Sequence, residues 1–141
     1  MNFSEVLNRV IVLAGKVRDY YDTELPKRFP RYPLIDGNEE DVPPPPEEKE
    51  LSDFLATLSD DMIYQLILIQ YLGRLDFGVD DLAKQYDGLK DTVGDPADAV
   101  ALMMMDKATL ADELSDGLEE LRKHKINVDK MPLKKVKVRK R

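Results

Sequence analysis

The stretch "DMIYQLILIQYLGRLDFGVDDL", residues 61–82, decides the fold because it contains the longest apolar run of the chain. A helix that is apolar on every side is typical of a position surrounded by neighbouring elements. The letters "LILI" would also suit a buried strand, but the length of the run and the lack of partner strands favour a helix. We therefore expect a central helix from Asp61 to Leu72, capped by Ser59 or Asp60.

The turn that follows predicts a structural role for Gly73, Arg74, Asp76 and Phe77. Gly73 is expected to end the helix in the left-handed conformation, which glycine adopts without steric cost. Phe77 is expected to fill the space between the two helices. Arg74 is expected to reach the last carbonyls of the preceding helix or the carboxylates of the next helix, whose first turn would hold Asp80 and Asp81.

The triplet Asp76-Phe77-Gly78 also occurs in the magnesium-binding loop of protein kinases. The sequence has neither the glycine-rich phosphate loop nor the "HRD" catalytic loop of that fold. The stretch "DFGVDD" does not match a calcium loop either, because its third position is Gly and its twelfth is not Glu. We therefore predict neither catalysis nor metal binding at this corner.

Three more helices are expected after the corner. Apolar side chains at three- and four-residue spacing predict the first, and "GDPADA" predicts the start of the second, with Asp95 as N-cap and Pro96 in the first turn. That second helix is expected to run to about Met105. Thr109 with Asp112 resembles a capping box, which would open a last amphipathic helix.

Upstream of the central run, residues 2–22 predict an amphipathic helix with Asn2 and Glu5 as a cap pair. Seven of the nine prolines lie in residues 23–48, which are expected to form a linker or extended arm. A short helix that includes Leu51 and Leu55 follows it.

These patterns predict an all-α fold, a compact bundle of five or six helices. We divide the chain into an N-terminal helix packed on the main domain (1–22), a proline-rich linker (23–48), a helical domain (49–124) and a basic, flexible tail (125–141).

Several residues of this bundle resemble a known family. The resemblance rests on Leu72-Gly73-Arg74, on Asp76-Phe77 and on the closing helix "LADELSDGLEEL". Residues from about Ser59 to Leu121 are thus similar to a small bacterial helical family known as domain of unknown function 3775, although a Trp expected near the corner is missing. The resemblance implies an all-α fold and supplies no activity.

Composition excludes several chemistries. The 141 residues include no Cys and a single His, so thiolate metal sites and paired His ligands cannot form within one chain. No apolar stretch reaches the roughly 20 residues that a bilayer requires. We expect a cytoplasmic, non-enzymatic protein with no cofactor and no membrane partner, in which His124 is a solvent-exposed side chain.

Charge is divided unevenly along the chain. The net charge is -7, but residues 122–141 carry ten Lys or Arg and one acid, whereas residues 1–121 carry eleven basic and 27 acidic residues. The basic tail is the best candidate for phosphate or acidic-partner contacts, through the side chains of Lys134, Lys135, Lys137, Arg139, Lys140 and Arg141. "PKRFPRYP" is a weaker basic candidate.

Met103, Met104 and Met105 allow two interpretations. They are core residues, or they form an adaptable surface that receives a partner helix.

The sequence therefore predicts a macromolecular-binding protein with a protein partner. Two alternatives stay open: a nucleic-acid-associated regulator that uses the tail, and an acidic nucleic-acid mimic that inhibits a DNA- or RNA-binding enzyme. A homo-oligomer is compatible with either.

Overall fold

The computed structural model describes residues 1–24, 27 and 45–133. In these ranges the chain forms helices and no strand, which confirms the all-α prediction. The six α-helices of the described residues are α1 (Phe3–Asp19), α3 (Pro46–Ala56), α4 (Asp60–Gly73), α5 (Leu82–Val93), α6 (Pro96–Met105) and α7 (Leu110–Lys123). Three shorter turns accompany them: a π-helical turn at Tyr20–Glu24 and 3-10 turns at Val79–Asp81 and Val128–Lys130.

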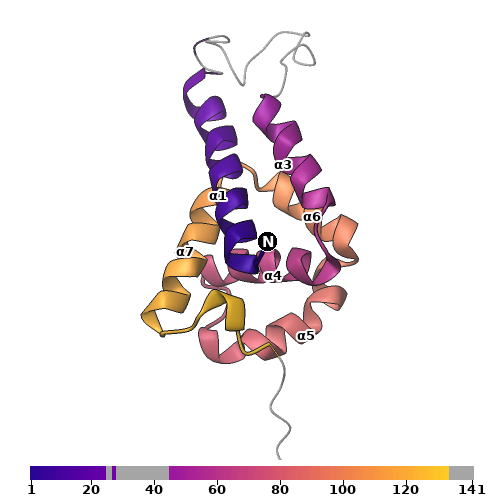
Figure 1. The fold of residues 1–141 in the computed structure, drawn as a ribbon, viewed down its shortest axis with the longest axis vertical. Coiled ribbons are helices and arrows are strands. Elements are labelled where there is room, and N and C mark those ends of the chain that lie inside the picture. The colour runs from indigo at the N-terminus through magenta and orange to yellow at the C-terminus, as the bar shows by residue number, and fades with distance from the viewer. Residues whose placement is uncertain (25–26, 28–44, 134–141) are drawn as a thin grey trace, which may run out of the picture.

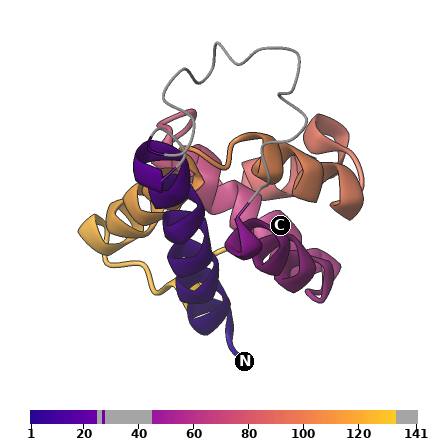
Figure 2. The same ribbon diagram turned by 90° about the horizontal axis from the view of Figure 1, so that it is seen from above.

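The central helix is α4, as expected from its sequence. It crosses the middle of the molecule while α1 and α3 stand beside one another (Figure 1). Viewed from above, α1 lies between α7 and α3 (Figure 2), in agreement with its packing against both. The α4 side chains from Leu66 to Ile69 are all fully buried, as a helix with neighbours on every side requires.

Local sequence signals set most helix starts. The Asn2 side chain accepts from the Glu5 N–H at 2.9 Å and the Glu5 carboxylate accepts from the Asn2 N–H, so this predicted cap pair is confirmed. Ser59 caps α4 by accepting from the Met62 N–H. Asp95 caps α6, with Pro96 at the first turn. Each cap satisfies N–H groups that have no partner within the helix.

The predicted cap of α7 was wrong. Thr109 has helical backbone angles (φ -119°, ψ -8°) and its side chain does not accept from the first turn. Its hydroxyl instead donates to the Glu113 carboxylate at 3.0 Å. A residue already in the helical conformation cannot fold its side chain over the N–H groups that follow, so the capping box does not form.

Gly73 does not end α4 in the left-handed conformation, contrary to prediction. The residue with positive φ is Leu75 (φ 61°). The Leu75 N–H donates to the Leu72 carbonyl at 3.0 Å and the Asp76 N–H to the Tyr71 carbonyl at 3.1 Å, which together form a Schellman motif. The helix therefore ends at Gly73, one residue beyond the expected Leu72, and its left-handed residue lies two positions after the glycine.

Gly73 serves the contact between α4 and α7. A Cβ at this position would collide with the Glu113 carbonyl oxygen and would lie 2.8 Å from the Gly117 nitrogen. A Cβ on Gly117 would in turn lie 2.7 Å from the Ile69 Cγ2 atom. Helices α4 and α7 pack against each other more extensively than any other pair of described helices. The two glycines let these two helices approach closely.

The segment after α7 differs from the flexible tail predicted from residue 125. Val128 is buried, and Met131 and Leu133 pack against the core. The Asp129 carboxylate accepts from the Ser4 N–H at 2.8 Å, which ties the segment to the start of α1. Residues 125–133 therefore belong to the body. The other domain boundaries stay predictions, and most of the proline-rich range lies outside the described residues.

Candidate interaction site

A groove opens where the end of α3 meets the starts of α4 and α6. The turn around Ser59 reverses the chain from α3 into α4, and the cap at Asp95 starts α6 across from it. We call this hollow the α3–α6 groove; it has a volume of about 350 Å³. It is lined by Leu55, Ala56, Leu58, Asp60, Ile63, Pro96, Ala97 and Val100. Seven of these eight side chains are apolar, and we call them the floor of the groove. The floor suits aliphatic groups.

Carboxylates lie near the groove: Asp60 lines it, and Asp95 and Asp98 flank the lining residues Pro96 and Ala97 in the sequence. Tyr64, on α4 next to the groove residue Ile63, donates its hydroxyl to the Gly94 carbonyl at 2.9 Å. Desolvation raises the pKa of Tyr64 above its usual 10.0, and the negative charges of Asp60, Asp95 and Asp98 raise it further. The charges of these three acids thus act on the same phenol.

These three carboxylates, which we call the acidic rim, have no cationic partner within the described ranges. The ion pairs of those ranges involve other acids. Asp95 and Asp98 each accept from the other's backbone N–H in the cap of α6, and from no other group of the described residues. The three residues are exposed, so the rim keeps its negative charge at the surface. An aliphatic floor near it fits a ligand that carries apolar and cationic groups together.

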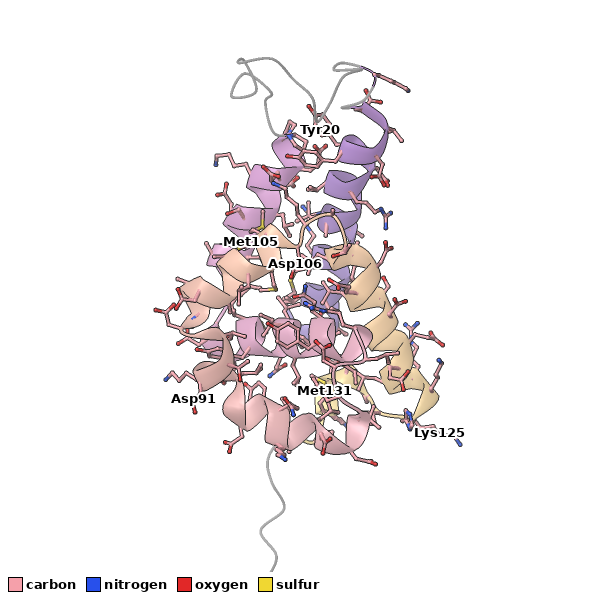
Figure 3. The ribbon with its side chains drawn as sticks, turned by 180° about the vertical axis from the view of Figure 1, so that it is seen from behind. Tyr20, Asp91, Met105, Asp106, Lys125 and Met131 are labelled. Atoms are coloured by element: carbon pink, nitrogen blue, oxygen red, sulfur yellow. The ribbon has the colours of Figure 1, made fainter. Side chains whose placement is uncertain are left out.

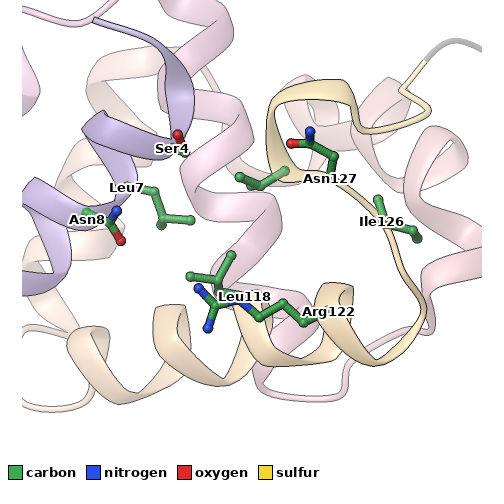
Figure 4. A pocket seen from close by; sticks show the side chains of 8 residues that line it. Ser4, Leu7, Asn8, Leu118, Arg122, Ile126 and Asn127 are labelled. Atoms are coloured by element: carbon green, nitrogen blue, oxygen red, sulfur yellow. The ribbon is translucent and has the colours of Figure 1, made fainter.

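A second, smaller hollow of about 210 Å³ separates α1 from the end of α7 (Figure 4). Leu118 and Arg122 of α7 face Leu7 and Asn8 of α1 across it, and residues 126–128 close the third side. The Arg122 guanidinium lies 3.9 Å from the Glu119 carboxylate. Because its lining mixes amide, hydroxyl and aliphatic groups, this hollow has no single chemical preference.

The predicted corner lies beside a polar cluster. Gln70 is fully buried, and its amide nitrogen donates to the Asp106 and Glu113 carboxylates, both at 3.0 Å. Its orientation is fixed because both neighbours only accept. Its carbonyl oxygen has no partner among the described residues. Asp106 lies in the turn after α6 with its side chain 40% exposed, and Figure 3 shows Asp91 and Lys125 on opposite flanks of the molecule.

Arg74 completes this cluster and does not pair with Asp80 and Asp81, which were one of the two contacts expected for it. Its guanidinium lies 3.6 Å from the Glu113 carboxylate, 3.6 Å from Asp76 and 3.8 Å from Asp106. Asp80 and Asp81 belong to the separate 3-10 turn before α5. Phe77 is half-buried and packs on the core. The corner residues thus connect α4 to α7 and to the turn after α6.

The three methionines of the predicted partner surface differ in how far they are buried in the fold. Met103 is fully buried, which excludes it from an exposed partner surface, and Met104 is half-buried against the core. Met105 alone of the three is exposed, at 78%. Helix α6 contributes to a hollow through Pro96, Ala97 and Val100 at its other end, which the methionine pattern did not indicate.

The predicted tail contacts (Lys134, Lys135, Lys137, Arg139, Lys140 and Arg141) lie outside the described residues. The chain before them is also basic, with Arg122, Lys123, Lys125 and Lys130 at the end of α7 and beyond it. His124 caps α7 with its side chain half exposed, 3.3 Å from the Glu120 carboxylate.

Comparison with known proteins finds one family. A family model described as "Protein of unknown function (DUF3775)" matches residues 48–122, more than half of the chain. No curated protein and no solved structure matches the chain. In the described ranges, no helix has both the length and the apolar character to cross a membrane. The matched residues include every residue that lines the α3–α6 groove.

Proposed function

The chain belongs to the DUF3775 family of proteins of unknown function, and we propose that it is a non-enzymatic protein-binding module. The α3–α6 groove receives a segment of a partner protein, and that segment carries aliphatic and basic side chains. The observation that supports this role is an aliphatic floor near three exposed carboxylates that form no ion pair within the described residues. The setting that we propose is the bacterial cytoplasm.

The floor and the rim contribute differently to binding. Burying one aliphatic side chain contributes about 1.5–3 kcal/mol, whereas an exposed ion pair contributes about 0.2–1 kcal/mol. Affinity therefore comes mainly from apolar side chains in the floor. The rim selects among apolar segments, since it attracts basic ones and repels acidic ones.

A capture experiment with a blocked groove tests this function. Ala97 lines the groove and is exposed, so Ala97→Trp fills the hollow without entering the core. Val12→Trp places the same ring on the half-exposed face of α1 and serves as the matched control. Tagged chains are purified from the native lysate after nuclease treatment, and co-purifying proteins are quantified.

We expect at least one protein to be retained by the wild type and by Val12→Trp, and to be reduced at least tenfold by Ala97→Trp. Equal retention by all three chains would place binding elsewhere on the molecule. No nuclease-resistant partner at all would contradict the proposed function.

A second candidate function is nucleic-acid association through the tail. The basic residues at the end of α7 favour it, because they extend the positive charge of the tail onto the body. In the same experiment it predicts that every partner disappears with nuclease. If all six tail cations contact phosphates, affinity for duplex DNA falls with salt at a log–log slope of about -5.

A further inference from the structure

We propose that a second copy of this chain docks on α6 as an antiparallel helix pair and covers the α3–α6 groove, so that a partner protein must displace it. The inference rests on the proposed function, because it adds a second occupant for the same groove. It also gives the groove a control, since association of the chain with itself limits access to the binding site.

Helix α6 is apolar on every side but is not surrounded by other elements. Residues 99–105, "AVALMMM", contain no polar or charged side chain. Of these seven residues, only Ala99 and Met103 are buried. The exposed positions of α7, by comparison, hold Asp112, Ser115, Asp116, Glu119 and Arg122. A helix that is apolar all round is normally covered, as α4 is, so the open side of α6 indicates a cover that the described residues do not provide.

The open side of α6 is continuous with the groove. Helix α6 packs on α3, α4 and α5, on the flank opposite α7 (Figure 1). Four residues that are exposed or half-buried follow the i, i+3, i+4, i+7 spacing of one helix face; we call them the α6 face, and they are Ala97, Val100, Ala101 and Met104. Ala97 and Val100 also line the groove, so a molecule that covers this face covers the groove wall as well.

The α6 face is complementary to itself in an antiparallel pair. A two-fold axis that passes between Val100 and Ala101 places Val100 opposite Ala101 of the second copy. The same axis places Ala97 opposite Met104 of the second copy. Each small side chain thus meets a larger one, and the contact repeats on both sides of the axis, as in a two-fold symmetric interface. The face carries no charge, so the pairing brings no like charges of this face together.

The self-contact is weak enough to be displaced. Helix α6 has ten residues, so its face is about 15 Å long and 10–12 Å wide, well below the roughly 800 Å² that each partner buries in a standard interface. We expect a dissociation constant on the order of 0.1 mM. Residues 97–105 include no Lys or Arg, so this face gives the acidic rim no ion pair. A partner with aliphatic and basic side chains gains such pairs and binds more tightly.

Disulfide trapping in the full-length chain tests the pairing. The protein contains no Cys, so each introduced Cys is its only thiol. Two copies of Ala101→Cys face each other beside the axis, where a close helix pair permits the Cα separation of about 4.4–6.8 Å that a disulfide needs. Two copies of Ala97→Cys are offset by seven helical residues, about 10.5 Å, and lie out of reach. Val12→Cys, on the half-exposed face of α1, is the control for random collision.

At a protein concentration of about 0.2 mM, near the expected dissociation constant, we expect Ala101→Cys to form a disulfide dimer at least tenfold faster than Ala97→Cys or Val12→Cys. A mixture of Ala97→Cys and Met104→Cys should form the mixed dimer at least tenfold faster than either chain links to itself. Equal rates at positions 101 and 12, or self-linking of Ala97→Cys as fast as the mixture, would overturn the inference.

Sedimentation equilibrium measures the contact without a covalent link. The wild type should change from monomer to mostly dimer between about 10 µM and 1 mM. Ala101→Glu places two like charges beside the axis and should weaken association at least tenfold, whereas Val12→Glu should leave it unchanged. Both positions are exposed, so circular dichroism should show the same helix content in all three chains. A wild type that is still monomeric at about 1 mM would contradict the pairing.

Protein capture from the native lysate separates this inference from the proposed function. The oxidised Ala101→Cys dimer should retain at least tenfold less partner protein than the same chain after reduction, because only the dimer covers the groove. Equal capture would show that the dimer leaves the groove open and would overturn the inference. If the chain stays monomeric while capture depends on Ala97, only the self-contact fails. If the dimer forms but the reduced chain retains no nuclease-resistant protein, the proposed function fails and the pairing of α6 stands.

Discussion

Single residues at the end of α4 show how tertiary contacts override local preference. The sequence places its glycine at position 73, but the left-handed residue is Leu75, which costs about 1–2 kcal/mol relative to glycine. Gly73 is needed where α4 meets the backbone of α7, so it is not the residue that terminates the helix. A local pattern cannot distinguish these two uses of glycine, because the second depends on a helix 40 residues away in the sequence.

The α4–α7 crossing predicts a large cost for Gly73→Ala. The added methyl group meets backbone atoms of Glu113 and Gly117, which cannot move without separating the two helices. We expect a loss of about 3 kcal/mol in the free energy of unfolding, measured by urea denaturation. Gly88→Ala is the control: nothing lies within 4 Å of the added atom, and α5 should gain about 0.5–1 kcal/mol. Equal effects of the two changes would contradict the close crossing.

The Schellman motif predicts that Leu75→Gly stabilises the protein. Glycine adopts a positive φ without steric cost, and Leu75 is 73% exposed, so little burial is lost. We expect a gain of about 0.5–1 kcal/mol in thermal or urea unfolding. Leu75→Ala keeps the steric cost and should change stability little. A destabilised Leu75→Gly chain would show that the Leu75 side chain, rather than its backbone, matters.

At the scale of elements, periodicity and start signals predict the helices well. The spacing of apolar residues predicts α1, α3, α5 and α7, a continuous apolar run predicts α4, and the start signal at Asp95 predicts α6. The caps at Asn2, Ser59 and Asp95 fix three of the starts. The α3–α6 groove was not predictable from the same signals. It is formed by the gap between the ends of three helices, and their relative positions follow from packing on α4 rather than from any local pattern.

The environment of Tyr64 on α4 predicts how the stability of the protein depends on pH. Desolvation and the charges of Asp60, Asp95 and Asp98 raise the pKa of Tyr64 in the folded chain. Above pH 10 the folded state therefore binds more protons than the unfolded state, so stability should fall as the pH rises. In an NMR titration of the tyrosine ring carbons, we expect Tyr64 to ionise above pH 10.0.

Asp60→Asn removes one of these charges and should lower the pKa of Tyr64 toward 10.0. The elevation should persist in part, because desolvation contributes most to it. Asp91→Asn, on the exposed end of α5, should leave the titration unchanged. A Tyr64 that ionises at its usual pH in the wild type would show that the acidic rim does not gather around it.

At the scale of the whole molecule, the acidic groove and the basic residues lie in different parts of the fold. The acidic groove lies at the junction of α3, α4 and α6, and the basic residues gather at the end of α7 and beyond it. Both features lie in a chain whose net charge of -7 hides the division. The charge division was visible in the sequence, whereas the groove that gives it a binding role became visible only in the fold.

The most direct measurement of the central claim is photo-crosslinking from within the groove in the native cell. A photoreactive amino acid replaces Ala97 in the full-length chain, and in a matched chain it replaces Val12 on α1. We predict a protein adduct from position 97 that survives nuclease treatment and is absent from position 12. No intermolecular protein adduct from position 97, or the same adducts from both positions, would contradict the account.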